Sequence, residues 1–222
     1  MKTDTAHRAW DVKWATEEGR ADWIAAEPDV LETATELSSR VGLVRALDLG
    51  CGIGRHALLF ARLGFEVSAV DLAEAGLAEV RRNAEAEGLE IDARVAAMTE
   101  LPFADDEFDY VLSFNVLYHG DPAVVRRAIA EIRRVLKPGG IFQGTMLSRR
   151  NAGFGVGTEV APDTFVRDAG DDMDDSDKVH PHFYCDASGL VAVYDGFELL
   201  SLRDALHKKP GSWHWHLVAE RK

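Results

Sequence analysis

Apolar and polar positions along the chain follow two periods, one typical of buried strands and the other of amphipathic helices. Short apolar runs predict strands over residues 44–49, 65–70, 89–95, 108–114, 141–147, 197–204 and 212–220. Apolar residues at helical spacing predict helices over residues 1–40, 55–64, 74–87, 122–136 and 186–194. Because strands and helices alternate through most of the chain, we expect an α/β fold with a parallel sheet and helices on both faces.

Glycine, proline and aspartate mark the ends of these segments. Gly64 and Gly88 follow two of the predicted helices, at the position where glycine commonly ends a helix. Asp121 and Pro122 stand at the start of another helix as its cap and first-turn residue. The sequence KPGG at 137–140 breaks the chain before the fifth strand, and the turn-like HKKPG joins the last two strands into an antiparallel hairpin.

The alternation stops between residues 148 and 181, where glycine, arginine and aspartate dominate. A stretch of this length without periodicity predicts an irregular insertion or a lid. Its aspartate-rich part, residues 168–177, is typical of a solvated loop. A calcium loop beginning at Asp172 fits less well, because Asp177 and Phe183 would replace its turn glycine and its bidentate glutamate.

Size and charge narrow the classes of protein. At 222 residues we expect a single domain over residues 1–222, with residues 1–40 as an amino-terminal helical cap. The formal net charge of −13 argues against a nucleic-acid partner, because phosphate contacts need a basic surface. No apolar run approaches the ~20 residues that span a bilayer, and the amino terminus lacks the apolar core of a secretory signal. With only two cysteines, Cys51 and Cys185, we expect a cytoplasmic protein.

A glycine-rich turn follows the first predicted strand. Gly50, Gly52 and Gly54 permit the positive φ angles of a tight strand-to-helix turn and allow a ligand to approach the backbone. Asp71 stands at the end of the second strand, where a carboxylate can accept hydrogen bonds from a ribose diol. The pair predicts a site for a nucleoside-containing cofactor.

A nicotinamide dinucleotide is one cofactor of this kind, and its fingerprint is G-x-G-x-x-G. Counted from Gly50, the third glycine position holds Arg55. Counted from Gly52, it holds Ala57, a residue that the fingerprint sometimes allows. An NAD-dependent oxidoreductase therefore stays open as an alternative.

Four segments resemble, in order and spacing, the motifs of class I S-adenosylmethionine-dependent methyltransferases over residues 45–145: ALDLGCGIGRHALLFARLG, VSAVDLAEAGL, LPFADDEFDYVLSFNVLYH and IRRVLKPGGIF. The resemblance implies a Rossmann-like three-layer sandwich with a seven-stranded, mostly parallel sheet of order 3-2-1-4-5-7-6 and an antiparallel strand 7. The amino-terminal segments WDVKW and ADW also resemble the start of TehB-like small-molecule methyltransferases.

The resemblance implies a role in cofactor binding for each matching residue. Gly50 and Gly52 would pass under the methionine part of S-adenosylmethionine, with Asp48 nearby through its carboxylate or a water molecule. Cys51 would lie inside the same loop as a small apolar residue rather than a nucleophile. Asp71 would hold the ribose hydroxyls.

The adenine end departs from the family pattern at one position. Leu72 would lie against the adenine ring, and Asn115 would offer its backbone carbonyl to the methionine ammonium group. Many relatives carry an aspartate for the adenine amino group where this chain has Ala97. The backbone around Met98 and Thr99, together with apolar contact, would then hold the adenine.

Methyl transfer from a sulfonium ion is an in-line displacement, so alignment and exclusion of water are the main tasks of the protein. A base is needed only for an acceptor that enters protonated. His119, just after the fourth strand, is our candidate for the base or for a substrate contact, and Tyr118 is a candidate wall of the pocket. A helix-capping role for His119 and a packing role for Tyr118 are the alternatives.

Aromatic residues suggest a cover for the site. Trp10 and Trp14 are four positions apart and share one face of the first helix, which would close over the cofactor and form a wall of the substrate site. Burial in the core is the alternative. His214 and His216 point to one face of the last strand, where we expect them to pack.

His180 and His182 at the end of the insertion are candidate substrate contacts. Anchoring of the loop is the simpler interpretation, and a metal held together with a nearby aspartate is a further one. We assign no metal to the site.

The sequence as a whole predicts S-adenosylmethionine-dependent methyl transfer to a small-molecule acceptor, with S-adenosylhomocysteine as the product. A non-catalytic protein that binds an S-adenosyl ligand, and the NAD-dependent oxidoreductase, are the alternatives. We expect a monomer or a homodimer.

Overall fold

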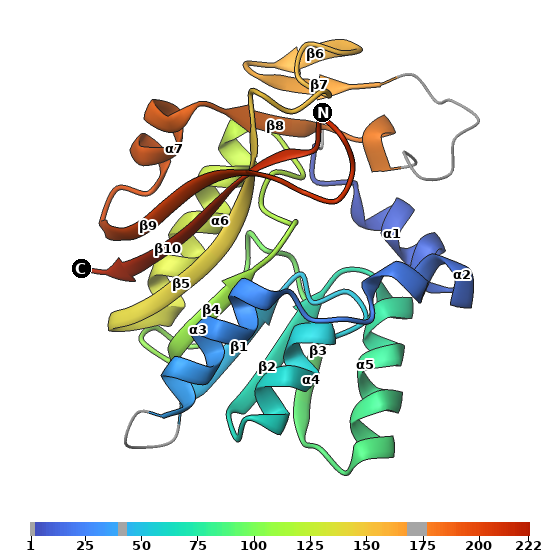
Figure 1. Cartoon of the computed structure of the whole chain (residues 1–222), viewed down its shortest axis with the longest axis vertical. Coiled ribbons are helices and arrows are strands. Elements are labelled where there is room, and N and C mark those ends of the chain that lie inside the picture. Colours follow the sequence, from blue (N-terminus) through green and yellow to red (C-terminus); the bar gives the residue numbers. More distant parts are fainter. Residues whose placement is uncertain (1–2, 40–43, 168–176) are drawn as a thin grey trace.

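The computed structural model describes residues 3–39, 44–167 and 177–222. Its helices are α1 (His7–Trp14), α2 (Glu17–Arg20), the short helix η1 (Ala21–Trp23), α3 (Pro28–Ser38), α4 (Arg55–Arg62), α5 (Glu74–Glu87), α6 (Pro122–Val135) and α7 (Ala187–Val193). Its strands are β1 (Arg45–Leu49), β2 (Glu66–Asp71), β3 (Ile91–Val95), β4 (Phe108–Ser113), β5 (Leu136–Ser148), β6 (Thr158–Ala161), β7 (Thr164–Val166), β8 (His182–Cys185), β9 (Phe197–Leu206) and β10 (Trp213–Arg221). Figure 1 shows their arrangement.

The sheet has the predicted strand order. β3, β2, β1, β4 and β5 pair side by side in parallel. β10 then pairs antiparallel with both β5 and β9, so these seven strands lie in the order β3-β2-β1-β4-β5-β10-β9. With the two carboxy-terminal strands counted as 6 and 7, this is the order 3-2-1-4-5-7-6, and the predicted antiparallel strand 7 is confirmed. The predicted count of seven strands is too low, because β8, β7 and β6 continue from the end of β5 and bring the sheet to ten strands among the described residues.

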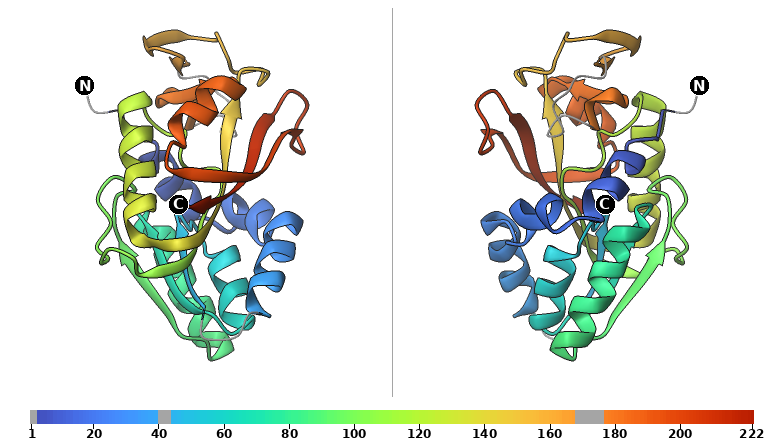
Figure 2. Two further views of the ribbon diagram at one scale, coloured as in Figure 1. Left: turned by 90° about the vertical axis from the view of Figure 1, so that its left-hand side faces the viewer. Right: turned by 90° about the vertical axis from the view of Figure 1, so that its right-hand side faces the viewer.

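Helices cover both faces of the sheet and make three layers. Successive side chains of a strand point to opposite faces, so Leu47 and Leu49 of β1 join a core with α6, whereas Ala46 joins a core with Phe60 of α4. Figure 2 shows α6 on one side of the sheet and α3 and α4 on the other. The predicted three-layer sandwich is confirmed.

The fifth strand begins earlier than predicted. KPGG does not interrupt it, because Phe108 of β4 already pairs with Leu136 and an irregularity in the register follows. Gly139, with φ of +75°, absorbs the local bend. The glycines therefore make a bulge within β5 rather than a break before it.

The prediction of an irregular insertion over residues 148–181 is only partly correct, because the segment contains short strands. β6 and β7 form a hairpin through a turn at Asp163, whose φ is +54°. β8 pairs with β7 and also with the end of β5. These strands are too short to show a period in the sequence. Most of the aspartate-rich stretch lies at 168–176, outside the described residues, and the lid remains a prediction.

The amino-terminal cap is helical, but it is built from separate pieces. The Thr16 hydroxyl accepts a hydrogen bond from the Gly19 N–H at 3.0 Å and starts α2, and Pro28 begins α3 in the first helical turn. Asp11 of α1 accepts a hydrogen bond from the Ala75 N–H of α5 at 2.9 Å. This contact holds α1 beside the carboxyl ends of the parallel strands.

Candidate functional site

The glycine loop forms the floor of a cavity at the carboxyl ends of β1 and β2. Gly50 and Gly52 have φ of +71° and +53°, a region that glycine adopts without strain. A Cβ atom at Gly50 would lie 2.4 Å from Val116 Cγ2, and one at Gly52 would lie 3.1 Å from the Trp14 ring. Both positions therefore need glycine, for its backbone angle and for its lack of a side chain.

Asp71 links this loop to the end of β2. Its carboxylate accepts hydrogen bonds from the Gly52 and Ala73 N–H groups, each at 2.8 Å. Burial raises the pKa of Asp71, although the backbone N–H groups around the carboxylate oppose that rise. A carboxylate can accept about four hydrogen bonds, so this side chain retains acceptor capacity toward the cavity that it lines.

Asp48 lies beneath the loop and does not line the cavity. It is 2% exposed, and its Oδ2 accepts a hydrogen bond from the Ala57 N–H at 3.0 Å, which ties β1 to the first turn of α4. Burial raises the pKa of Asp48 to about 7. In this structure Asp48 supports the loop, whereas the resemblance implied a place close to the cofactor.

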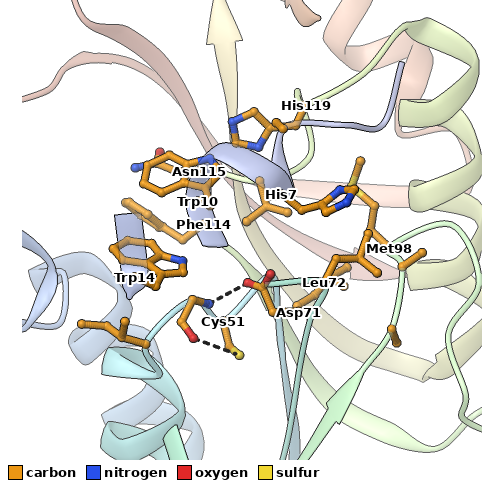
Figure 3. Close-up of a pocket in the computed structure, with 18 of the residues that line it drawn as sticks. His7, Trp10, Trp14, Cys51, Asp71, Leu72, Met98, Phe114, Asn115 and His119 are labelled. Atoms are coloured by element: carbon orange, nitrogen blue, oxygen red, sulfur yellow. Dashed lines mark hydrogen bonds between the residues drawn. The ribbon is translucent and has the colours of Figure 1, made fainter. Parts of the chain in front are cut away.

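Three tryptophans cover the loop. Trp10 and Trp14 stack with ring centroids 5.0 Å apart, and Trp23 meets both rings edge-on at 5.1 and 5.6 Å. Figure 3 shows Trp10 and Trp14 above the loop at Cys51 and facing Asp71. The Trp10 Nε1 is buried and has no hydrogen-bond partner among the described residues, so it is a donor free for a bound molecule.

The adenine end of the predicted site lines the same cavity. Leu72 and Met98 lie along one wall (Figure 3), and Thr99 and Ala97, the position without the expected aspartate, line the same cavity. Asn115 lies on the opposite side with a φ of +62°, and its N–H donates to Thr145 Oγ1 at 2.7 Å. The threonine hydroxyl donates in turn to Asn115 Oδ1 at 3.1 Å, which fixes the conformation of this turn.

A second cavity adjoins the first and is lined by more polar groups. The two share five lining residues: Trp10, Trp23, Arg55, Phe114 and Asn115. In the second cavity His216 Nδ1 lies 2.8 Å from Asp29 Oδ2, and His216 Nε2 lies 2.7 Å from His207 Nε2. The prediction that His214 and His216 pack is therefore only part of their role, because both side chains also line this cavity.

His119 lines the first cavity, and Tyr118 and Asp177 line the second. His119 and His182 lie side by side, with ring centroids 4.8 Å apart, and both face Asp177. Burial lowers the pKa of His182 to about 3, so its ring is neutral at pH 7. Burial would raise the pKa of Asp177, but Lys178 and the two histidines hold it well below its usual range.

His180 and His182 lie apart. His180 lines neither cavity, and its Nδ1 is 2.9 Å from the Thr5 hydroxyl, which anchors the insertion to the amino-terminal segment. His182 is 1% exposed and also lines neither cavity, although it contacts His119. The structure thus shows anchoring at His180 and a buried cluster at His182.

The sequence interpretation found eleven of the 23 described residues that line the first cavity and few of those that line the second. The predicted residues that line the first cavity are Trp10, Trp14, Gly50, Cys51, Gly52, Asp71, Leu72, Met98, Thr99, Asn115 and His119. The lining residues that it missed include Trp23, Arg55, His56 and Phe114. Trp23 belongs to the ADW segment and Arg55 follows Gly54 directly, so both carried a local signal. Asp29 and His207 carried none, and the alternation in the last strand marked His216 only for packing, because only the fold brings these three residues together.

Comparison with known proteins shows which known family part of this chain is similar to. Residues 46–140 match the family described as a methyltransferase domain. A ubiquinone biosynthesis O-methyltransferase of Dinoroseobacter shibae is 40% identical over 114 residues, which are 51% of this chain and 45% of that protein. The chain therefore spans about half the length of the curated relatives that it matches.

Solved structures share the fold over nearly the whole chain. One is a Burkholderia thailandensis 1,6-didemethyltoxoflavin-N1-methyltransferase with bound 1,6-didemethyltoxoflavin and S-adenosylhomocysteine, 20% identical, with a TM-score of 0.70 over 98% of this chain and 88% of that chain. Another is TehB from Haemophilus influenzae, 20% identical, with a TM-score of 0.65 over 90% of this chain and 64% of that chain.

The sheet order and the glycine loop define an α/β protein with a cavity at the carboxyl ends of its strands, which is where sheets of this kind bind their ligands. Residues 46–140, less than half of the chain, are similar in sequence to a methyltransferase domain, and the solved structures above share the fold of the chain. Within the described parts of the chain, no helix is both long and apolar enough to cross a membrane.

Proposed function

We propose that the protein transfers the methyl group of S-adenosylmethionine to a small-molecule acceptor. The observation that carries the proposal is the pair of adjoining cavities. The first has the glycine loop and Asp71, and the second opens beside it across the side chains of Trp10, Phe114 and Asn115. A separate compartment next to the cofactor site favours an enzyme over a protein that only binds an S-adenosyl ligand.

The residues of the first cavity fit S-adenosylmethionine. Gly50 and Gly52 leave the backbone open to close approach, and Asp71 has acceptor capacity left for a ribose diol. Arg55 is the only lysine or arginine among the described lining residues, and it can pair with the methionine carboxylate. We infer that Leu72, Met98 and Thr99 contact the adenine and that the Asn115 carbonyl accepts from the methionine ammonium group.

The bound cofactor supplies a methyl group already activated by the positive sulfonium. The protein must align it with the acceptor and exclude water. The Trp10, Trp14 and Trp23 rings close the cavity from one side, and aromatic faces also favour a cation. Tyr118, whose phenol pKa burial raises well above its usual range, stays protonated and can donate a hydrogen bond to the acceptor.

His119 lines the first cavity, its neighbour Tyr118 lines the second, and we infer that His119 contacts the acceptor. A direct test is a screen of small nucleophiles monitored by release of S-adenosylhomocysteine. For an acceptor that enters protonated, His119→Ala is expected to lower kcat about 100-fold. His180→Ala is the matched control, because His180 lines neither cavity, and it should retain wild-type turnover. Equal turnover by wild type and His119→Ala would remove His119 from the reaction.

We also propose that the protein is located in the cytoplasm. Cys51 and Cys185 are both buried and unpaired, which suits the reducing cytoplasm. The proposed acceptor is a small molecule, and a monomer or a homodimer remains our prediction.

A further inference from the structure

Three buried side chains meet at the boundary of the two cavities: His119, Asp177 and His182 are 8%, 9% and 1% exposed. One potential ligand atom from each lies within 4.8 Å of the other two. We propose that this cluster binds a divalent first-row transition-metal ion such as Zn²⁺, with a coordination position left toward the second cavity. The proposal departs from the sequence expectation of a site without a metal.

The separations between the ligand atoms suit such an ion. His182 Nε2 lies 3.1 Å from Asp177 Oδ2, and His119 Nε2 lies 3.7 Å from the same oxygen. Ligands of a tetrahedral zinc ion with bonds near 2.1 Å are about 3.4 Å apart. The two observed separations fall on either side of that value, and no pair of the three ligand atoms is more than 4.8 Å apart.

The hydrogen bond of His182 to the backbone directs its Nε2 at the carboxylate of Asp177. Its Nδ1 lies 2.8 Å from the His180 carbonyl oxygen, which can only accept, so Nδ1 carries a proton. Nε2 lies 3.1 Å from Asp177 Oδ2. In the metal-bound site the ion would lie between these two atoms, in place of a proton on Nε2. A metal-binding histidine commonly donates its other N–H to a carbonyl in this way.

His119 gives an independent indication. Its Nε2 is buried and has no hydrogen-bond partner among the described residues, although it points toward Asp177. A buried ring nitrogen without a partner is costly unless something binds it. The backbone also fixes the two rings, because His119 pairs with His182 as an isolated bridge and the Phe183 N–H donates to the Tyr118 carbonyl at 2.9 Å.

Lys178 opposes a cation at this position. Its Nζ lies 3.3 Å from Asp177 Oδ2, so its ammonium group competes with the metal for the carboxylate. The lysine side chain is 22% exposed and can withdraw toward solvent, whereas the two histidines cannot. Lys178→Met should therefore strengthen metal binding.

The position of the cluster gives the ion a role that rests on the proposed function. His119 lines the first cavity and Asp177 lines the second, so the ion would lie between the two compartments. Its remaining position would bind and orient an acceptor that carries an oxygen or nitrogen donor atom. The predicted acceptor class is therefore a small molecule able to coordinate a metal.

The experiment measures metal binding alone, with neither cofactor nor acceptor present, so it is independent of any methyl transfer. The protein is treated with a chelator and dialysed. It is then titrated with Co²⁺, whose visible absorption reports tetrahedral nitrogen and oxygen coordination, and with Zn²⁺ by calorimetry. We expect one saturable site per chain. His182→Gln and Asp177→Asn should each weaken it at least about tenfold, and Lys178→Met should tighten it.

His180→Gln is the matched control, because this neighbouring histidine is bonded to Thr5 and lies outside the cluster, and it should bind as the wild type does. Thermal melting of each metal-free variant verifies that it is folded. The absence of saturable binding by the folded wild type would overturn the proposal, since His182 would then carry a second proton opposite Asp177. Equal affinity in His182→Gln, Asp177→Asn and the wild type would overturn it as well.

Discussion

Asp48 and Asp71 stand at the ends of neighbouring strands beside the same glycine loop, yet their surroundings differ. Asp71 is half-buried, lines the first cavity and accepts from Gly52 and Ala73. Asp48 is almost fully buried and has the Ala57 N–H as its hydrogen-bond donor. Asp71 is therefore suited to hold a ligand, whereas Asp48 holds the loop in place.

The raised pKa of Asp48 predicts a specific dependence of stability on pH. The native carboxyl keeps its proton up to about pH 7, whereas the unfolded chain releases it near 3.8. Between these values the unfolded state binds fewer protons, so the contribution of Asp48 to the free energy of unfolding falls as the pH rises. Each pKa unit is worth about 1.4 kcal/mol.

Asp48→Asn should remove this dependence. Urea unfolding at pH 5 and pH 8 measures the difference in unfolding free energy between variant and wild type. From pH 5 to about pH 7 is two pH units, so the difference should shift by about 3 kcal/mol in favour of the variant. A difference that is the same at both pH values would show that Asp48 is already ionised in the native protein.

At the scale of elements, periodicity predicted the helices and strands that have strong local signals. The Asp121 cap is present, with its carboxylate accepting from the Ala123 and Val124 N–H groups. Short strands escaped prediction, since β8 has four residues and is defined by its partners Leu147 and Thr164. The start of β5 also escaped, because it depends on pairing with Phe108.

The position of α1, which holds Trp10 over the glycine loop, leads to a prediction about cofactor binding. Trp10→Ala removes the ring that stacks on Trp14 and the free Nε1 donor, so the Kd for S-adenosylhomocysteine should rise about tenfold, or about 1.4 kcal/mol. Trp213→Ala is the control, because Trp213 lines neither cavity. Calorimetry on the two variants measures the Kd for S-adenosylhomocysteine. An unchanged Kd in Trp10→Ala would exclude α1 from the cofactor site.

At the scale of the whole molecule, the second cavity joins the two ends of the chain. Asp29 of α3 and His216 of β10 are 187 positions apart, and His207 comes from the end of the β9–β10 hairpin. Burial lowers the pKa of His207 to about 4, so the ring is neutral at pH 7. No local pattern predicts such a group, which is why the sequence described the cofactor site better than the acceptor site.

This arrangement predicts that a substitution in the second cavity changes turnover without changing the affinity for the cofactor. When His216 Nδ1 donates its proton to Asp29, His216 Nε2 can accept a hydrogen bond from His207. These three hydrogen-bonded side chains can then take up a proton from the acceptor. His216→Gln should lower kcat at least about tenfold and leave the Kd for S-adenosylhomocysteine unchanged. Turnover assays and calorimetry on one preparation test this. A parallel loss of both quantities would mean that the two cavities do not act separately.

The most direct test of the cofactor assignment is calorimetric titration of the folded protein with S-adenosylmethionine. We predict saturable binding at one site, an affinity at least about tenfold lower in Asp71→Asn, and wild-type affinity in Asp195→Asn, whose exposed carboxylate lies outside both cavities. No binding by the folded wild type, or equal binding by Asp71→Asn, would contradict the assignment of the glycine-loop cavity to this cofactor.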